Sequence, residues 1–147
     1  MKTIKLKKIG EQLPMVSNVL RDINAGGCGY FAEHLYHLFI KIGVKPKLCL
    51  ITRQIVDRKN ANYNFNHIIL KVGKYYYDNR GRNDKEKLKY ILNKAYWNDW
   101  RIHEVEIDLL FELNNNGKEM YNCYFRKRNR TYKKTLKNFF ENLENTI

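Results

Sequence analysis

A glycine pair, a cysteine and then a helical pattern of apolar residues constrain this chain more than any other stretch. The segment reads Gly26-Gly27-Cys28, and beyond it apolar residues recur three, four or seven positions apart, at Phe31, Leu35, Leu38, Phe39 and Ile42. This spacing places the apolar side chains on one face of a helix. Gly43 follows the last of them and is a typical helix stop. We therefore predict a buried helix that begins at Cys28.

The start of a helix is a favourable position for a reactive cysteine. Its unpaired backbone N–H groups and the positive end of the helix dipole both favour an anion. A thiolate is such an anion, and this environment lowers the pKa of a cysteine. The preceding glycines allow a sharp turn and leave room for a substrate carbonyl to approach the backbone. A lone cysteine is more often a small buried residue, so the interpretation of Cys28 depends on residues further along.

Length and composition indicate one globular domain over residues 1–147. Hydrophobic residues make up 44% of the chain, which is too many for a disordered protein. The chain has 28 Lys and Arg residues against 15 Asp and Glu, and its net charge of +13 attracts polyanions or acidic proteins. The charge therefore suggests a class of partner, without indicating a fold.

The three cysteines are irregularly spaced, which argues against a disulfide framework and against a zinc knuckle. We expect no metal and no other cofactor. The first residues lack the apolar stretch of a secretory signal, and no run is long enough to span a membrane. The expected protein is cytoplasmic and has no membrane partner.

The periodicity along the chain predicts an α+β fold, in which N-terminal helices, including the cysteine-bearing one, pack on a mainly antiparallel sheet. Taken in order, the expected elements are an edge strand at 2–9, a helix at 13–23, the cysteine-bearing helix, strands at 47–56, 65–72 and 74–78, a helix at 84–96, strands at 101–108 and 121–125, and a C-terminal helix carrying Leu136 and Phe140, with loops at 58–64, 79–83 and 114–117.

A histidine and an acid lie on the second and third of these strands. If Gly73-Lys74 forms a tight turn, Val72 faces Tyr75, and the pairing continues toward the start of the second strand. His67 and Asp78 then share a face as diagonal neighbours, close enough for a carboxylate to reach an imidazole nitrogen. A shift of one residue would instead place Asn79 on the face of His67 and make it the orienting group.

A cysteine, a histidine and an acid in these positions meet the needs of nucleophilic catalysis. The thiolate attacks a carbonyl, the imidazole moves the proton, and the acid fixes the imidazole tautomer. The oxyanion that forms needs donors. The backbone N–H of Cys28 is one candidate, and the side-chain amide of Asn24 or Gln12 is another.

The run at residues 26–32, followed by Asn66-His67 and Tyr77-Asp78, resembles the papain-like cysteine superfamily. The transglutaminase-like branch, with Cys, His and Asp in that order along a helix and two strands, is the most similar. The resemblance covers residues 10–82. It implies an enzyme of peptide or amide bonds, namely a protease, deamidase or acyl transferase, with a protein or peptide substrate. Cys28 would be the nucleophile, His67 the general base and Asp78 the orienting acid. No tryptophan flanks the histidine and no glutamine directly precedes Cys28, so the oxyanion donor and substrate class stay open.

A basic cluster near the C-terminus supports a second class of function. Under this alternative the protein is a non-catalytic binding protein on the same fold, for nucleic acid or an acidic protein partner. A solvated start of a helix would have the same composition. The candidate polyanion-binding residues are Arg126, Lys127, Arg128, Arg130, Lys133 and Lys134.

Overall fold

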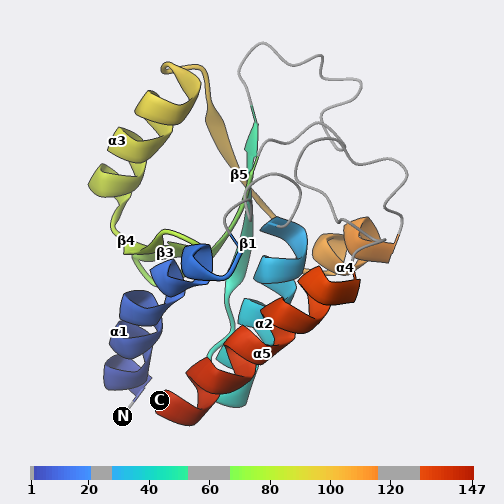
Figure 1. Cartoon of the computed structure of the whole chain (residues 1–147). Helices are drawn as coiled ribbons and strands as arrows, with labels where there is room; N and C mark the ends of the chain where they lie inside the picture. Colours follow the sequence, from blue (N-terminus) through green and yellow to red (C-terminus); the bar gives the residue numbers. More distant parts are fainter. Residues whose placement is uncertain (1, 21–27, 53–66, 116–129) are drawn as a thin grey trace.

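A five-stranded antiparallel sheet runs through the middle of the protein, with helices on both of its sides (Figure 1). The computed structural model describes residues 2–20, 28–52, 67–115 and 130–147. The strands lie in the order β4-β3-β2-β1-β5. The fold is therefore α+β, as the periodicity predicts. The described elements are α1 (Lys2–Gln12), the 3-10 helix η1 (Leu13–Asn18), α2 (Cys28–Lys41), β1 (Lys47–Thr52), β2 (His67–Val72), β3 (Tyr75–Asp78), β4 (Gly81–Asn83), α3 (Lys85–Tyr96), β5 (Arg101–Val105), α4 (Asp108–Asn115) and α5 (Arg130–Thr146).

The helix predicted to start at Cys28 is α2, and it ends as the sequence indicates. Gly43 has a φ of 81°, a left-handed conformation that glycine adopts without steric cost. Its N–H donates to the carbonyl of Ile40, and the N–H of Val44 donates to the carbonyl of Phe39. This pair of hydrogen bonds is a Schellman motif, which satisfies carbonyls at the end of the helix.

The hairpin between β2 and β3 has the predicted register. Val72 is opposite Tyr75 and Leu70 is opposite Tyr77. The two-residue turn places Gly73 at a φ of 60°, as a type II′ turn requires of its first central residue. β2 is the central strand of the sheet, because it lies between β3 and β1.

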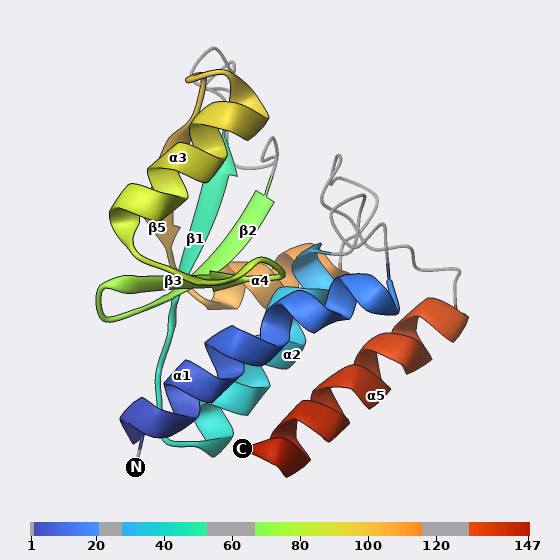
Figure 2. The same ribbon diagram turned by 60° about the vertical axis from the view of Figure 1, so that its left-hand side comes forward.

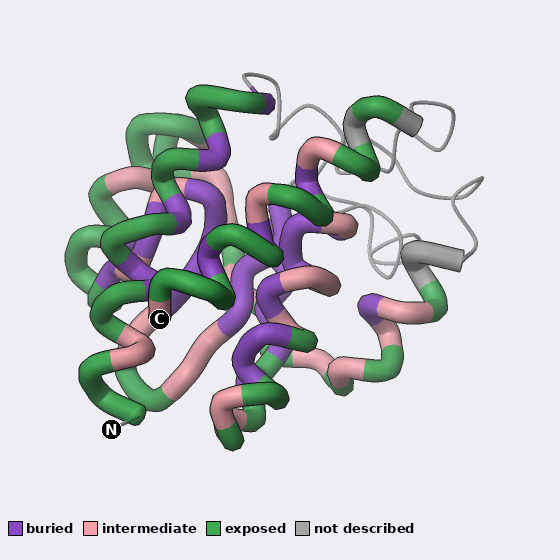
Figure 3. Tube along the Cα trace, turned by 60° about the horizontal axis from the view of Figure 1, so that its bottom comes forward, coloured by how far each residue is buried: buried purple, intermediate pink, exposed green. Residues whose placement is uncertain are grey.

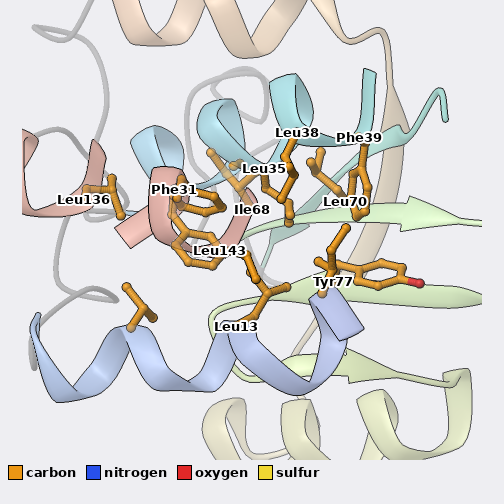
Figure 4. Packing of buried hydrophobic residues seen from close by; sticks show 14 of the residues in the cluster. Leu13, Phe31, Leu35, Leu38, Phe39, Ile68, Leu70, Tyr77, Leu136 and Leu143 are labelled. Atoms are coloured by element: carbon orange, nitrogen blue, oxygen red, sulfur yellow. The ribbon is translucent and has the colours of Figure 1, made fainter. Parts of the chain in front are cut away.

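Two hydrophobic clusters lie on opposite sides of the sheet. Figure 2 shows α2 and α5 on one side of the strands and α3 on the other. In the larger cluster, residues of α1, α2 and α5 pack on one face of the strands (Figure 4), and buried stretches follow the strands and the inner sides of the helices (Figure 3). In the smaller cluster, Leu88 and Leu92 of α3 pack against Cys49, Ile51 and Ile69. Both faces of the central strands are therefore buried.

The prediction of an edge strand at residues 2–9 is wrong, because these residues begin α1. Leu6, Ile9 and Leu13 recur at helical spacing, and Ile9 and Leu13 are fully buried. Packing against β4 favours the helix, since Gly10 lies directly against the side chain of Arg82. The helix predicted at 13–23 is a 3-10 helix over Leu13–Asn18, with Pro14 in its first turn.

Five further predictions need correction or lie outside the described residues. Part of the predicted loop at 79–83 pairs with β3 as the short edge strand β4. The predicted strand at 101–108 ends at Val105, and α4 follows it and includes the first residues of the predicted turn at 114–117. The loop at 58–64 and the strand at 121–125 lie outside the described residues. None of the helices in the described ranges is long and apolar enough to cross a membrane.

Two glycines at positive φ allow the contact between α1 and β4 to be tested. A Cβ on Gly81, whose φ is 103°, would lie 2.8 Å from the carbonyl oxygen of Gly10 and 3.1 Å from Cγ of Pro14. A Cβ on Gly73 would meet nothing within 4 Å. We expect Gly73→Ala to cost about 1 kcal/mol of unfolding free energy from backbone strain alone. Gly81→Ala should cost about 1–3 kcal/mol more, because α1 must also move. Urea unfolding of the two variants measures the difference, and equal costs would contradict the close packing of α1 on β4.

Candidate active site

His67 and Asp78 form a buried hydrogen bond between neighbouring strands. His67 is the first residue of β2 and Asp78 the last residue of β3. Nε2 of His67 lies 2.8 Å from Oδ2 of Asp78, and the two side chains are only 3% and 4% exposed. The turn at Gly73-Lys74 produces this arrangement, because it sets the register that puts both side chains on one face.

Asp78 has further partners in the turn that follows it. Its Oδ1 accepts a hydrogen bond of 2.8 Å from the backbone N–H of Arg80, which is the pattern of an Asx turn. Nη1 of Arg80 lies 3.5 Å from Oδ2. Burial acts to raise the pKa of Asp78, but the hydrogen bond and charge of His67 together with Arg80 outweigh it, so the pKa is lowered. The acid is therefore ionised at neutral pH.

An ionised Asp78 determines which nitrogen of His67 carries the proton. A carboxylate without a proton only accepts hydrogen bonds, so the Nε2 that faces it must donate. In a neutral imidazole the proton then resides on Nε2, and Nδ1 is the basic nitrogen. The carboxylate thus fixes the orientation of the imidazole, and Nδ1, the acceptor atom in this tautomer, is directed away from the acid.

Cys28 is the first residue of α2, and its side chain lies outside the described part of the structure. Residues 42–46 reverse the chain between α2 and β1, so the start of α2 points toward the end of the sheet where β2 begins. His67 is opposite Ile51 of β1, and Ile51 belongs to the cluster beneath α3. The side chain of His67 therefore lies on the side of the sheet that α3 covers, whereas α2 packs on the other side. The start of α2 and the imidazole of His67 therefore lie toward the same end of the sheet but on opposite sides of it.

Of the other candidates for orienting or oxyanion roles, Gln12 and Asn79 are in the described part of the chain. Asn24 lies outside the described residues. Gln12 is exposed at the end of α1, in a segment that passes beside Gly81, the residue paired with Asp78. Asn79 is 9% exposed and adjoins the acid, but the observed register leaves Asp78 as the partner of His67.

The predicted polyanion site is described only in part. Arg126, Lys127 and Arg128 lie outside the described residues, as does the side chain of Arg130 at the start of α5. Lys133 and Lys134 are exposed on α5. Nζ of Lys133 lies 5.0 Å from the centre of the Tyr30 ring, which is a cation–π distance.

Cys49 is a packing residue of β1. It is fully buried in the cluster beneath α3, and burial raises the pKa of its thiol to about 11. A thiol with this pKa is not a nucleophile at neutral pH. Within the described ranges, no three His, Cys, Asp or Glu side chains are grouped so that they could hold a metal ion.

The role of Arg80 is not apparent from the sequence pattern. Its side chain is 30% exposed, and its buried Nη1 has no hydrogen-bond partner although it lies near Asp78. The run Asp78-Asn79-Arg80-Gly81 is typical of a turn in which the aspartate bonds the backbone two residues on. That signal indicates the backbone contact of Arg80, whereas the position of its guanidinium depends on the tertiary fold.

Comparison of the chain with protein-family models, with curated proteins and with solved structures finds no match. The assignment of a function therefore depends on the geometry of the site.

Replacement of Asp78 tests the electrostatics of the pair. Because the pKa of Asp78 is lowered by folding, its contribution to stability is complete above its unfolded pKa of about 3.9 and is lost as the pH falls through its folded pKa. We expect Asp78→Asn to cost about 1–3 kcal/mol of unfolding free energy at pH 7. That cost should shrink as the pH falls below about 4.

Urea unfolding at a series of pH values measures this cost. Asn79→Ala is the matched control, because Asn79 is also largely buried but carries no charge. Its effect on stability should not depend on pH. A cost of Asp78→Asn that stays constant through the acid range would contradict an ionised, stabilising Asp78.

Proposed function

We propose that the protein is a cysteine-dependent enzyme that acts on a peptide or amide bond of a protein or peptide substrate. The observation that carries the proposal is the buried 2.8 Å hydrogen bond between Nε2 of His67 and Asp78. Burying an ionised carboxylate beside a histidine is costly unless the pair is compensated, and such pairs are concentrated at functional sites. Cys28, at the start of α2, is the proposed nucleophile.

The first half of the proposed reaction forms a thioester. Nδ1 of His67 accepts the thiol proton of Cys28, and the thiolate attacks the substrate carbonyl carbon. The oxyanion of the tetrahedral intermediate is stabilised by the backbone N–H of Cys28 and by a second donor. The intermediate collapses as the imidazolium gives its proton to the leaving nitrogen, which departs as an amine or ammonia. Asp78 holds the imidazole in place and stabilises its positive charge.

The second half of the reaction determines the type of enzyme. Water activated by Nδ1 of His67 would attack the thioester in a protease or deamidase and release a carboxylic acid. In an acyl transferase, an amine would attack instead and form a new amide bond. Both routes regenerate the thiol of Cys28, and in both the bond-forming and proton-transfer steps involve only the three proposed residues and the substrates.

The arrangement of the elements supports a papain-like fold of the transglutaminase-like type. In this proposal α2 carries the nucleophile, β2 carries the base and β3 carries the acid, in the chain order of that superfamily. The antiparallel pairing of β2 with β3 and the packing of α2 against both strands are consistent with it.

The reactivity of the three cysteines tests the nucleophile. We expect iodoacetamide to alkylate Cys28 with a pH midpoint below about 8.5, the value for a free cysteine. Cys49 is an internal control that should remain unmodified, because it is fully buried and its pKa is about 11. Mass spectrometry of each cysteine-containing peptide at a series of pH values measures the rates in one sample.

His67→Gln tests whether the base acts on Cys28. Glutamine retains an N–H donor for the buried carboxylate of Asp78 but provides no base. We expect the alkylation midpoint of Cys28 to rise and its rate at pH 7 to fall by about tenfold or more. A midpoint at or above about 8.5 in the wild type, or one that His67→Gln leaves unchanged, would contradict the proposed catalytic role.

A further inference from the structure

The outer face of α3 carries two exposed aromatic rings. Tyr90 is 59% exposed, and Trp97, the first residue after the helix, is 87% exposed. Leu88 and Leu92 anchor the opposite face of the helix in the core. Tyr90 and Trp97 are seven positions apart, about two helical turns, which separates them by about 10 Å along the helix axis.

Trp97 has a backbone conformation that its packing does not explain. Its φ of 52° and ψ of 45° are left-handed, and Asn98 follows with a φ of 64°. This position at the end of a helix is usually glycine or asparagine, because a Cβ destabilises the left-handed conformation. Because the ring is 87% exposed, its burial contributes little stability to offset the backbone strain. Strained residues that contribute little to stability are found where a surface binds something.

Lysines accompany the two rings. Lys94 lies one turn beyond Tyr90 with its Nζ 4.6 Å from the centre of that ring, and Lys87 lies one turn before Tyr90. Both lysines are exposed, and α3 carries four lysines against one glutamate. The face is therefore both aromatic and cationic.

We infer that this outer face of α3, made of Lys87, Tyr90, Lys94 and Trp97, binds single-stranded nucleic acid. Unpaired bases stack on exposed aromatic rings, and lysines beside the rings contact the phosphates. A duplex keeps its bases stacked on one another, and an acidic peptide offers charge without flat rings. The combination of aromatic and cationic side chains thus favours a single strand over either alternative.

The α3 surface is separate from the proposed active site. It shares no residue with Cys28, His67 and Asp78, and α2 lies across the sheet from α3 (Figure 1). His67 lies on the side of the sheet that α3 covers, but the proposed surface is on the outer face of the helix, opposite Leu88 and Leu92, which pack on the sheet. Loss of binding at α3 should therefore leave alkylation of Cys28 unchanged, which distinguishes a failure of this inference from a failure of the proposed enzyme.

Trp97→Gly separates binding from stability. Glycine adopts the left-handed conformation freely, so the midpoint of urea unfolding should rise or stay the same. The affinity for a short fluorescent oligothymidylate, measured by anisotropy, should fall by about fivefold to a hundredfold, the range for loss of one stacked base. Tyr90→Ala should weaken binding to a similar degree.

Charge-matched variants separate a local site from the general attraction of a protein with a net charge of +13. Lys87→Gln with Lys94→Gln should weaken binding and reduce the slope of log affinity against log salt by about 0.7 per lost contact. Lys7→Gln with Lys8→Gln removes the same charge from exposed positions of α1 and should change both quantities less. Equal effects of the two pairs would overturn the inference.

Two further results would also overturn it. One is an unchanged affinity of Trp97→Gly and Tyr90→Ala for the oligothymidylate. The other is wild-type binding to a duplex, to polyglutamate or to anionic vesicles that is as tight as binding to the single strand and equally sensitive to Trp97→Gly. Selective loss of single-strand binding in the α3 variants supports the inference.

Discussion

An ionised carboxylate is buried at the end of β3, and the neighbouring chain is arranged to compensate it. Asp78 accepts hydrogen bonds from the imidazole of His67 and from the backbone N–H of Arg80, and the guanidinium of Arg80 lies beside it. Without these partners a buried charge would be strongly destabilising. The same contacts tie β2, β3 and the following turn together. A slip of one residue in the hairpin would leave the carboxylate unpaired.

The two proposed functions use different parts of the protein, although His67 and the inner face of α3 lie on the same side of the sheet. On one face α1, α2 and α5 pack around residues such as Leu50 and Ile68. On the other face α3 contributes only Leu88 and Leu92 to the fully buried core. The outer side of α3 is consequently available for an aromatic and basic surface. The His67–Asp78 pair lies at the start of β2 and the end of β3.

Features that depend on neighbouring residues could be predicted from the sequence, and features that depend on distant contacts could not. The spacing of apolar residues up to Gly43 sufficed for α2, and the turn at Gly73-Lys74 sufficed for the contact of His67 with Asp78. Residues 2–9 fit both a strand and a helix locally, and tertiary packing favours the helix, through the burial of Ile9 in the core and the contact of Gly10 with Arg82. Residues 81–83 form β4 through their pairing with β3, which local sequence does not indicate. The exposure and positive φ of Trp97 are likewise evident only in the structure.

A double-mutant cycle on the alkylation of Cys28 tests most directly whether Asp78 acts through His67 on the nucleophile. The rates at pH 7 are compared for the wild type, His67→Gln, Asp78→Asn and the double variant, each shown to be folded by circular dichroism. If the three residues act as a unit, Asp78→Asn should slow alkylation in the wild type and have no further effect in His67→Gln. Equal effects of Asp78→Asn in both backgrounds, or no effect in either, would contradict the catalytic role of the pair.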